Sequence, residues 1–414
     1  MRKILGLVLV PLVLAAGCGG GGGGGGTTPP PPPPPPAQVI TPPGPPNVEK
    51  IVVDSGPAGL TLTAVNTAYV SVNVCEPGTN TCQLIDHIEI DTGSVGLRII
   101  SSVIAGITLP AVSSGPNAEC LSFADGASWG SLAVADMELP ISGEKASGLT
   151  VHLIGSAAAG TPPAACNTPA VMKTENTVAD FGANGILGVG PFINDCNSVG
   201  DCGPGSQSAN YYNCTSPGTC TTATATLAQQ LPNPAVKFAT DNNGVIVELP
   251  AVSGATQASP SGSLVFGIGT QTNNALGSAT KLSADPSTGN ITASLNGTNF
   301  AIAYLDSGSN ANFFHDTALT VCPSPNQGFY CPASIVSENA TLTGAGGANV
   351  AADFSVDNAL NMFSQNATYT AFPDLSGPAI DNTAFDLGLS FFFGRNVFTG
   401  FENVSAKTQP YFAY

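Results

Sequence analysis

Two short segments of the chain place an aspartate in the same setting. His87 to Ile100 reads HIEIDTGSVGLRII, and Ala301 to Phe314 reads AIAYLDSGSNANFF. In each segment, an apolar run that alternates like a strand ends in Asp, a hydroxyl residue, Gly and Ser. Two carboxyl groups held close together share a proton, because both cannot ionise at low cost. Such a pair can activate one water molecule as a base and donate a proton, without a covalent intermediate.

The residues that follow Asp91 and Asp306 suit this chemistry. Glycine next to a carboxylate lets the backbone turn sharply so that its amides approach the charge. Hydroxyl groups can cross-link two loops or bond the outer carboxylate oxygens. We expect the sharp turn at Gly93 and Gly308. We expect Thr92 and Ser307 to cross-link the two loops, and Ser94 and Ser309 to bond the outer carboxylate oxygens.

One such tetrapeptide is a weak signal, because Asp, Gly and Ser together usually mark a turn. The chain contains an example: Ile51 to Gly56 reads IVVDSG and is followed by Pro57 in place of a hydroxyl residue. We therefore interpret Asp54 as part of a turn. Two motifs in matching apolar frames are a stronger signal, and they indicate two related halves of the molecule.

Further motifs make the chain resemble the pepsin-like aspartic proteases, in an uncharacterised bacterial lipoprotein branch. In that family, each catalytic loop is followed by a hydrophobic-hydrophobic-Gly element. Ala183 to Gly190 reads ANGILGVG and resembles the first of these elements, with Gly188 as its glycine. Ser390 to Phe401 reads SFFFGRNVFTGF and resembles the closing element, with Gly394 as its glycine. Ser261 to Gly269 resembles the strand that ends the first lobe.

The resemblance implies an all-β, bilobal pepsin-like acid-protease fold with the active-site cleft between two related lobes. We expect the first lobe at 51–272 and the second at 273–414. Asp91 and Asp306 would be the catalytic pair of an aspartic endopeptidase that hydrolyses a polypeptide substrate without a metal or organic cofactor. The composition, with 49 Gly, 35 Pro and 9% charged residues, also favours many short strands joined by turns.

The segment from Cys120 to Met137 resembles the flap, a hairpin that closes over the substrate in this family. Its sequence is CLSFADGASWGSLAVADM, with Gly126 and Gly130 as expected turn and bulge glycines. The usual flap Tyr is missing. Phe123 stands in the matching place and Trp129 lies on the same hairpin, so either ring is a candidate to cover the substrate. The alternative for both is a place in the core.

The Trp that commonly follows the first catalytic motif is also absent, and Arg98 lies near that place. The hydrogen-bonded support of the flap must therefore differ from that of the family. These departures keep a second hypothesis open, namely a catalytically silent pepsin-like binding or structural module on the cell surface.

A serine hydrolase is a third alternative, because Gly126 to Gly130 reads GASWG and matches a nucleophile elbow around Ser128. That motif requires a helix after the serine, with His downstream. His152 and His315 are available as bases. The segment 131–137, however, alternates like a strand, which disfavours this interpretation.

The N-terminus has the layout of a secretory signal, with Arg2 and Lys3 before an apolar run. Leu14 to Cys18 resembles the lipobox of bacterial lipoproteins, so we predict a lipoprotein signal peptide at 1–17 and lipidation of Cys18, with plain secretion as the alternative. Lipidation would anchor the exported protein to a membrane, in the outer membrane or at the cell surface. Residues 18–50, rich in Gly and Pro, are predicted to be a tether, and no basic prosegment is visible.

Asp and Glu outnumber Lys and Arg by 27 to 10, so nucleic acid is not an expected partner. Ten cysteines besides Cys18 favour disulfides in an exported chain, and a zinc site is disfavoured by the spacing and by only three His. The segment 191–223 is expected to be a disulfide-held insertion near the cleft. The pairs that are close in sequence are Cys75 with Cys82, Cys196 with Cys202, Cys214 with Cys220, and Cys322 with Cys331. Cys120 and Cys166 are left over and are available to pair with one another, although the sequence does not establish the connectivity.

Overall fold

The computed structural model describes residues 38–60, 62–124, 126–166, 173–196, 209–252, 258–365, 368–403 and 408–414. The chain is mostly β-sheet, so the predicted all-β class is confirmed. Its helices are short: α1 (Val178–Phe181), α2 (Ala359–Gln365) and α3 (Leu389–Phe392), with 3-10 turns at Ser101–Val103, Ala164–Cys166 and Pro234–Lys237. Within the described ranges, no helix has the length and apolarity needed to cross a bilayer.

The larger sheet contains most of the strands that precede residue 283 and two from the C-terminal end. Its strands are β1 (Val48–Val53), β2 (Ala68–Cys75), β3 (Cys82–Asp91), β4 (Val95–Ile100), β5 (Ala118–Ser122), β6 (Gly126–Glu138), β7 (Lys145–Ile154), β8 (Lys173–Thr174), β9 (Gly185–Val189), β10 (Ala209–Ser216), β11 (Thr219–Ala223), β12 (Gly244–Leu249), β13 (Ser261–Phe266), β14 (Leu282–Ser283), β22 (Arg395–Gly400) and β23 (Tyr411–Ala413). They follow the order β11-β10-β5-β6-β7-β4-β9-β3-β2-β1-β13-β12-β22-β23-β14, with β8 beside β6.

The smaller sheet is built from the region between residues 291 and 387. Its strands are β15 (Ile291–Leu295), β16 (Thr298–Leu305), β17 (Asn312–Phe314), β18 (Val336–Thr343), β19 (Asn349–Val356), β20 (Ser376–Gly377) and β21 (Ala384–Leu387). The order is β19-β18-β15-β16-β21-β17-β20. Strand β16 therefore has its parallel partner β21 on one side and β15 on the other.

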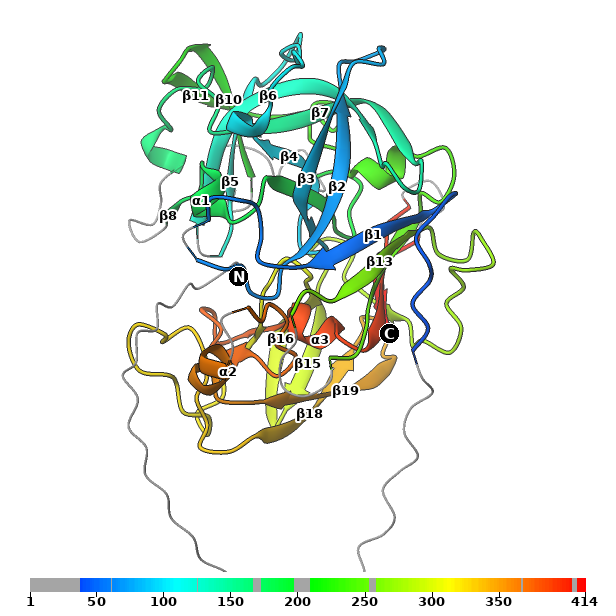
Figure 1. Cartoon of the computed structure of the whole chain (residues 1–414), viewed down its shortest axis with the longest axis vertical. Coiled ribbons are helices and arrows are strands. Elements are labelled where there is room, and N and C mark those ends of the chain that lie inside the picture. Colours follow the sequence, from blue (N-terminus) through cyan, green and yellow to red (C-terminus); the bar gives the residue numbers. More distant parts are fainter. Residues whose placement is uncertain are drawn as a thin grey trace, which may run out of the picture.

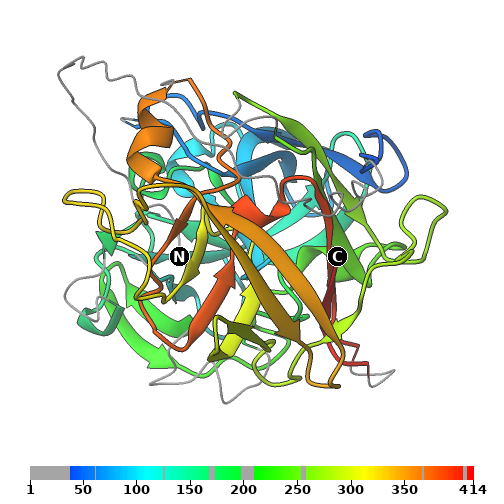
Figure 2. The same ribbon diagram turned by 90° about the horizontal axis from the view of Figure 1, so that it is seen from below.

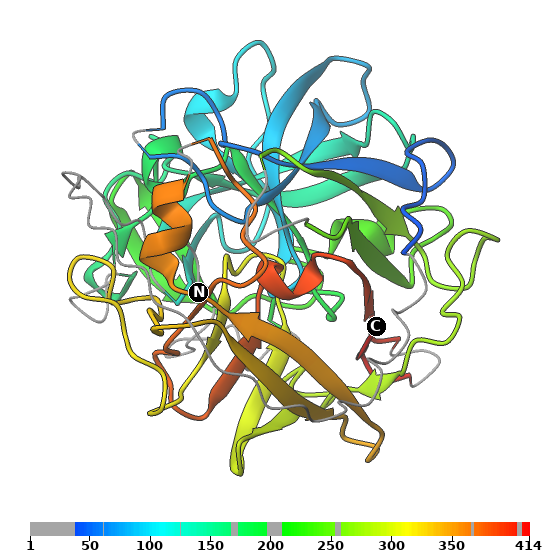
Figure 3. The same ribbon diagram turned by 60° about the horizontal axis from the view of Figure 1, so that its bottom comes forward.

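The two groups of strands occupy different parts of the molecule. In Figure 1, β2 to β11 lie in the upper part, β15, β16, β18 and β19 lie in the lower part, and β1 and β13 lie between them. Seen from below, the gold and orange hairpin β18–β19 crosses in front of the rest of the molecule (Figure 2). In Figure 3, α3 lies between this hairpin and the strands of the upper part.

Both aspartate segments are held by the same arrangement of strands. Strand β3, which ends at Asp91, pairs in parallel with β9, and β9 also pairs antiparallel with β4, the strand that follows the aspartate. Strand β16, which ends just before Asp306, pairs in parallel with β21, and β21 also pairs antiparallel with β17. The duplication in the sequence is therefore matched by a duplicated arrangement in space.

Apolar packing continues from one aspartate strand to the other. Ile90 and Leu187 of the larger sheet belong to the same buried cluster as Leu305 and Leu387 of the smaller sheet. Strand β9 is buried along its whole length, and the last four residues of β3 are buried, as is typical of strands in parallel pairs. The shared cluster fixes the two strand ends relative to one another, which is the condition for two carboxyl groups to meet.

The folded region begins earlier than the sequence predicts. Strand β1 starts at Val48, three residues before the expected boundary, and pairs with β13. Thr41 donates its backbone N–H to Glu248 Oε2 (2.6 Å), and Asn47 Nδ2 donates to the Phe266 carbonyl (2.8 Å). The C-terminal part of the predicted tether therefore packs on the fold. The strands β14, β22 and β23, which lie beyond residue 272, also belong to the larger sheet.

Four predicted disulfides are confirmed, and each closes a loop or joins strands of one sheet. They are Cys75–Cys82, Cys120–Cys166, Cys214–Cys220 and Cys322–Cys331. The predicted partner of Cys196, Cys202, lies outside the described residues, as do the predicted signal peptide and Cys18. The segment predicted as an insertion forms β10 and β11, and β10 extends the larger sheet beside β5.

Candidate functional site

Thr92 and Ser307 join the two aspartate loops by a reciprocal set of hydrogen bonds. The N–H of Thr92 donates to Ser307 Oγ (3.1 Å), and the N–H of Ser307 donates to Thr92 Oγ1 (2.9 Å). Each hydroxyl then donates to a carbonyl of the opposite strand, Thr92 to Leu305 (3.0 Å) and Ser307 to Ile90 (2.8 Å). Both side chains are buried. The loops are thus cross-linked as the sequence predicts.

Asp91 accepts hydrogen bonds from the two residues that follow its hydroxyl neighbour. Its Oδ1 accepts from the N–H groups of Gly93 (2.7 Å) and Ser94 (3.1 Å), and its Oδ2 accepts from Ser94 Oγ (2.5 Å). This is the local turn that aspartate side chains favour when they bond backbone groups a few residues ahead. These donors stabilise a carboxylate and fix its orientation.

Asp306 has the same type of local contacts in the second loop. Its Oδ1 accepts from the N–H of Gly308 (2.8 Å), and its Oδ2 accepts from Ser309 Oγ (3.0 Å). Ser94 and Ser309 therefore reach the outer carboxylate oxygens, as expected. The two loops are equivalent in this part of their structure.

Gly93 and Gly308 are required for space. A Cβ on Gly93 would lie 2.6 Å from Asp306 Cγ, and a Cβ on Gly308 would lie 2.7 Å from Asp91 Cγ. Each carboxyl group therefore rests against the glycine of the other loop, and the structure brings Asp91 and Asp306 together. Neither glycine has a positive φ. The amides of both glycines bond the aspartate of their own loop, as expected, and the close approach of the opposite carboxyl group is a second reason for glycine at these positions.

The surroundings of the pair favour a proton on Asp306. Asp91 and Asp306 are 4% and 8% exposed. Burial raises the pKa of Asp306 well above its usual value, and the neighbouring charges of Asp91 and Asp386 raise it further. Asp306 therefore keeps its proton at pH values at which an ordinary aspartate is ionised.

Asp386, which the sequence analysis missed, is a third carboxyl group beside the pair. It lies on β21, is fully buried, and its Oδ2 is 2.6 Å from Ser309 Oγ. Because Ser309 Oγ is also 3.0 Å from Asp306 Oδ2, the serine bridges two carboxyl groups. Burial raises the pKa of Asp386 to about 7.

The first hydrophobic-hydrophobic-Gly element lies where the sequence predicts it. Ile186 and Leu187 are buried on β9, and Gly188 is the register partner of Asp91. A Cβ on Gly188 would come within 2.8 Å of the Val95 backbone. The glycine therefore lets β9 pass directly behind the first loop.

The second element is a different segment from the predicted one. Leu387 pairs with Leu305, which puts Gly388 behind the second loop, where a Cβ would lie 2.6 Å from the Ser309 carbonyl. The predicted glycine, Gly394, follows α3 with φ 78°, and a Cβ there would lie 3.3 Å from the Ala251 Cβ, away from the second loop. The prediction was wrong because Asp386 stands where the pattern expects an apolar residue. Reading an Asp in that frame as a variant of the element would have found it.

The aromatic run at 391–393 is buried, as expected, but its structure differs. Phe391 and Phe392 belong to the helical turn α3, and Phe393 follows it, so the predicted core strand is a short helix. The helix lies directly after Gly388. The N–H of Leu389 donates to the Ser309 carbonyl (2.7 Å), which joins the start of α3 to the second loop.

The predicted flap segment forms the hairpin β5–β6, with the N–H of Phe123 bonded to the Gly126 carbonyl (2.8 Å). Phe123 is half-buried against Phe181 of α1. Trp129 points into the interior instead. It is 1% exposed, its indole N–H donates to the Gly160 carbonyl (3.0 Å), and its ring packs edge-on against Tyr212. The candidate role of Trp129 over a substrate was therefore wrong.

Two other expectations for this hairpin are corrected. Gly130 is not at a bulge, because the register of β6 with β7 is regular there; a Cβ would lie 1.9 Å from the Leu153 carbonyl oxygen. Ser128 is fully buried within β6 and donates to the Glu175 carbonyl (3.1 Å). A strand follows the serine where a nucleophile elbow needs a helix, so the serine hydrolase alternative is contradicted.

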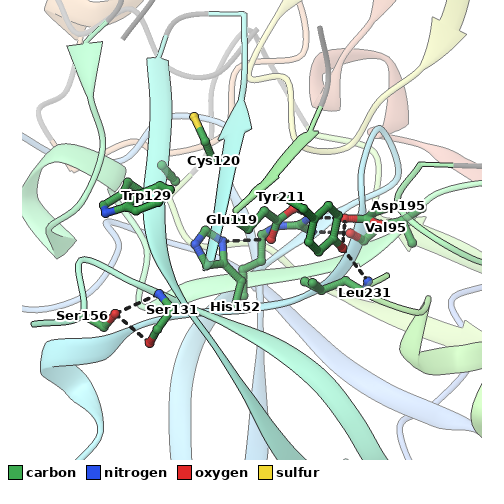
Figure 4. A network of polar contacts seen from close by, with 12 residues as sticks. Val95, Glu119, Cys120, Trp129, Ser131, His152, Ser156, Asp195, Tyr211 and Leu231 are labelled. Atoms are coloured by element: carbon green, nitrogen blue, oxygen red, sulfur yellow. Dashed lines mark hydrogen bonds and ion pairs between the residues drawn. The ribbon is translucent and has the colours of Figure 1, made fainter. Parts of the chain in front are cut away.

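Arg98, on the strand that follows the first loop, is the centre of a buried ionic cluster. Its Nη2 donates to Glu119 Oε1 (2.9 Å) and lies 3.4 Å from Asp195 Oδ2. The Tyr211 hydroxyl donates to Asp195 (2.8 Å), and His152 Nδ1 is 3.3 Å from Glu119 Oε2. Figure 4 shows Glu119, His152, Asp195 and Tyr211 gathered around this contact. The cluster ties β4 to β5, β7 and β10.

Charges within this cluster are balanced, because burial and the charge of Glu119 raise the pKa of Asp195 well above its usual value, which leaves Glu119 as the anion opposite Arg98. Although burial opposes ionisation of Arg98 and Glu119, their mutual attraction raises the pKa of the guanidinium and lowers that of the carboxyl. Burial lowers the pKa of His152 to about 4, so the imidazole is neutral at neutral pH. The Arg98–Glu119 pair therefore clamps the first strand of the hairpin to the strand behind Asp91.

Comparison with known proteins identifies one family. The family described as "Protein of unknown function (DUF3443)" matches the chain over residues 43–414, which includes both aspartate loops, the hairpin and the Arg98 cluster. No curated protein matches the chain.

Proposed function

The chain belongs to the DUF3443 family, and we propose that it is an aspartic endopeptidase with a bilobal, pepsin-like fold. The observation that carries the proposal is the pair Asp91 and Asp306, held face to face by the reciprocal Thr92–Ser307 bonds. The duplicated strand arrangement around the two loops supports two related lobes with the active-site cleft between them.

The proposed reaction uses one water molecule held between the two carboxyl groups. Ionised Asp91 takes a proton from the water as its oxygen bonds to the carbonyl carbon of the peptide, and Asp306 gives its proton to the carbonyl oxygen. The resulting diol then breaks the C–N bond. The proton on Asp91 passes to the leaving nitrogen, and one diol proton returns to Asp306, which restores the starting state.

The protonation of the pair supports this division of labour. Asp306 is the member whose pKa burial raises well above its usual value, so it is the member that holds the proton before reaction. Asp91 receives three donors from its own loop, which fix the orientation of the carboxyl group that accepts the proton in the proposed reaction. Activity requires one proton on the pair, so we expect it in acidic solution.

The test is digestion of a denatured protein across pH 3 to 7. Asp91→Asn and Asp306→Asn should each lower the rate by about 10³-fold or more, because each removes a proton acceptor or donor. The matched control is Asp285→Asn, which changes an exposed carboxylate and should leave the rate unchanged. A folded wild type that cleaves nothing at any pH would replace this proposal with the silent binding module. Cleavage that persists in both variants would show that the pair is not catalytic.

We also propose that the protein is exported and held to a membrane by lipid on Cys18. The apolar N-terminal run and the lipobox-like segment carry this proposal. Cys18→Ser should move the folded domain from the membrane fraction to the soluble fraction. Membrane association that is unchanged in this variant would refute the anchor.

A further inference from the structure

We propose that Asp386 is a positioning residue that joins Asp91 and Asp306 in one proton-sharing set of three carboxyl groups, and so extends activity toward neutral pH. The proposal rests on the proposed function, because it concerns the same pair. It goes beyond it by assigning a role to a buried side chain outside both aspartate loops. The geometry that points to it is the bridge through Ser309.

The bridge requires a proton on one of the carboxyl groups. Ser309 Oγ lies within hydrogen-bond distance of Asp306 Oδ2 (3.0 Å) and Asp386 Oδ2 (2.6 Å), but a hydroxyl has a single hydrogen to donate. If Ser309 donates to Asp306, its contact with Asp386 is satisfied when Asp386 is protonated and donates to Ser309. The result is a chain of donors directed from Asp386 to Asp306.

The surroundings of Asp386 make this protonation favourable. The side chain is fully buried, and burial raises its pKa to about 7. The register partner of Asp386 on β16 is Tyr304, and Asp306 lies two residues after Tyr304. On β17 its register partner is Phe313, and the first loop contributes the charge of Asp91. Of these neighbours, Asp91 and Asp306 are acidic, Tyr304 is neutral and Phe313 is apolar.

The equivalent position in the first half is apolar. Asp386 lies two residues before Gly388, and Ile186 lies two residues before Gly188. Both are buried on the strand that pairs in parallel with an aspartate strand. An ionisable residue at a position that a hydrophobic side chain can fill costs stability when it is charged. Because Asp386 lies beside the second loop and its equivalent in the first half is Ile186, the geometry points to a role of Asp386 in the protonation of Asp306.

The direction of the pH effect follows from the charges. Below pH 7, Asp386 is neutral and supports Ser309, which donates to Asp306. As the pH rises past about 7, Asp386 ionises, and its charge opposes ionisation of Asp306. Asp306 therefore keeps its proton to a higher pH than it would beside an apolar residue. The pH range of activity should therefore extend further toward neutral pH.

The first test measures titration of Asp386 without using activity. A carboxyl group whose pKa is raised from 3.8 to about 7 on folding contributes stability below about pH 4, which is lost as the pH rises to about 7. The Tm of Asp386→Asn minus that of wild type should therefore increase by about 5 °C between pH 4 and pH 7. Asp285→Asn is the control, since hydrogen bonds from Ser287 and Thr288 lower the pKa of the Asp285 carboxylate to about 2, and a lowered pKa gives no such increase over this range. A constant difference for Asp386→Asn would overturn the proposal.

The second test uses the pH profile of kcat/KM. Asp386→Asn keeps a donor for Ser309 but removes the charge, so the upper apparent pKa of kcat/KM should fall by about one unit. Asp386→Ile copies the first half and removes both, so kcat at pH 4 should also fall about tenfold. In a Ser309→Ala background this additional fall should disappear, because the donor chain is already broken.

The two tests separate failure of this proposal from failure of the proposed function. A pH-dependent Tm difference in a protein that cleaves nothing would leave the three-carboxyl set standing and reject the endopeptidase. An active wild type whose profile is unmoved by Asp386→Asn, with equal loss at every pH, would reduce Asp386 to a packing role and overturn the proposal.

Discussion

The two aspartate loops share their contacts with the backbone and differ in the side chains behind them. Each loop presents a glycine to the opposite aspartate, and each exchanges a hydroxyl bond with the other. Behind the first loop lie Ile186 and the ionic cluster of Arg98; behind the second lies Asp386. The shared part sets the distance between the carboxyl groups. The Arg98 cluster supports the hairpin β5–β6 beside the first loop. Asp386 influences the protonation of the aspartate pair from behind the second loop.

The largest effect should come from breaking the ionic cluster, which is found in the first half. Arg98→Met leaves Glu119 buried without its cation, so the free energy of unfolding should fall by about 3–5 kcal/mol in urea titrations. The matched control is Lys145→Met, which removes an exposed ion pair with Glu138 and should cost less than about 1 kcal/mol. Equal losses in the two variants would mean that the buried pair does not clamp β5 to β4.

The next effect concerns the glycines that the two halves share. Gly93→Ala puts a methyl group against the Asp306 carboxyl, and Gly308→Ala puts one against Asp91, so each should lower kcat/KM by about 10²-fold through displacement of the partner aspartate. Gly346→Ala is the control, because a Cβ there meets nothing within 4 Å and the residue has no positive φ. Full activity in either site variant would contradict the close approach of the carboxyl groups.

A smaller effect is expected from removal of the reciprocal hydrogen bonds between Thr92 and Ser307. Thr92→Val and Ser307→Ala each leave one buried N–H of the opposite loop without its acceptor, which should cost about 1–3 kcal/mol of unfolding free energy. The double variant should cost less than the sum, because the two side chains act on one another's loop. Strict additivity in a double-mutant cycle would show that the loops are held independently.

Local motifs explain why much of the site could be predicted from the sequence. The hydrogen bonds around Asp91 and Asp306 join residues within three positions of each other, or join equivalent residues of the two loops. Both kinds could be predicted from the two tetrapeptides. The same applies to Gly188 and to disulfides between cysteines that are close in sequence. The meeting of Asp91 and Asp306 is a long-range contact, and it could be predicted because the same pattern occurs twice in the sequence.

The remainder depended on contacts that have no local pattern. The cluster around Arg98 of β4 combines Glu119 of β5, His152 of β7 and Tyr211 of β10 with Asp195, which lies outside the strands. Asp386 broke the apolar pattern by which its element would have been recognised. Trp129 was misplaced because alternation on a strand does not say which face is covered, and the short run at 391–393 could not be distinguished from a strand by periodicity.

Binding of a statine-type transition-state mimic tests the central claim most directly, since its hydroxyl takes the place of the water between two aspartates. Calorimetry at pH 4 should give saturable binding to wild type. The same experiment should give at least a 100-fold weaker Kd for Asp91→Asn and for Asp306→Asn, and an unchanged Kd for Asp285→Asn. Equal affinity in the two site variants, or no binding to a folded wild type, would contradict the account of Asp91 and Asp306 as a catalytic pair.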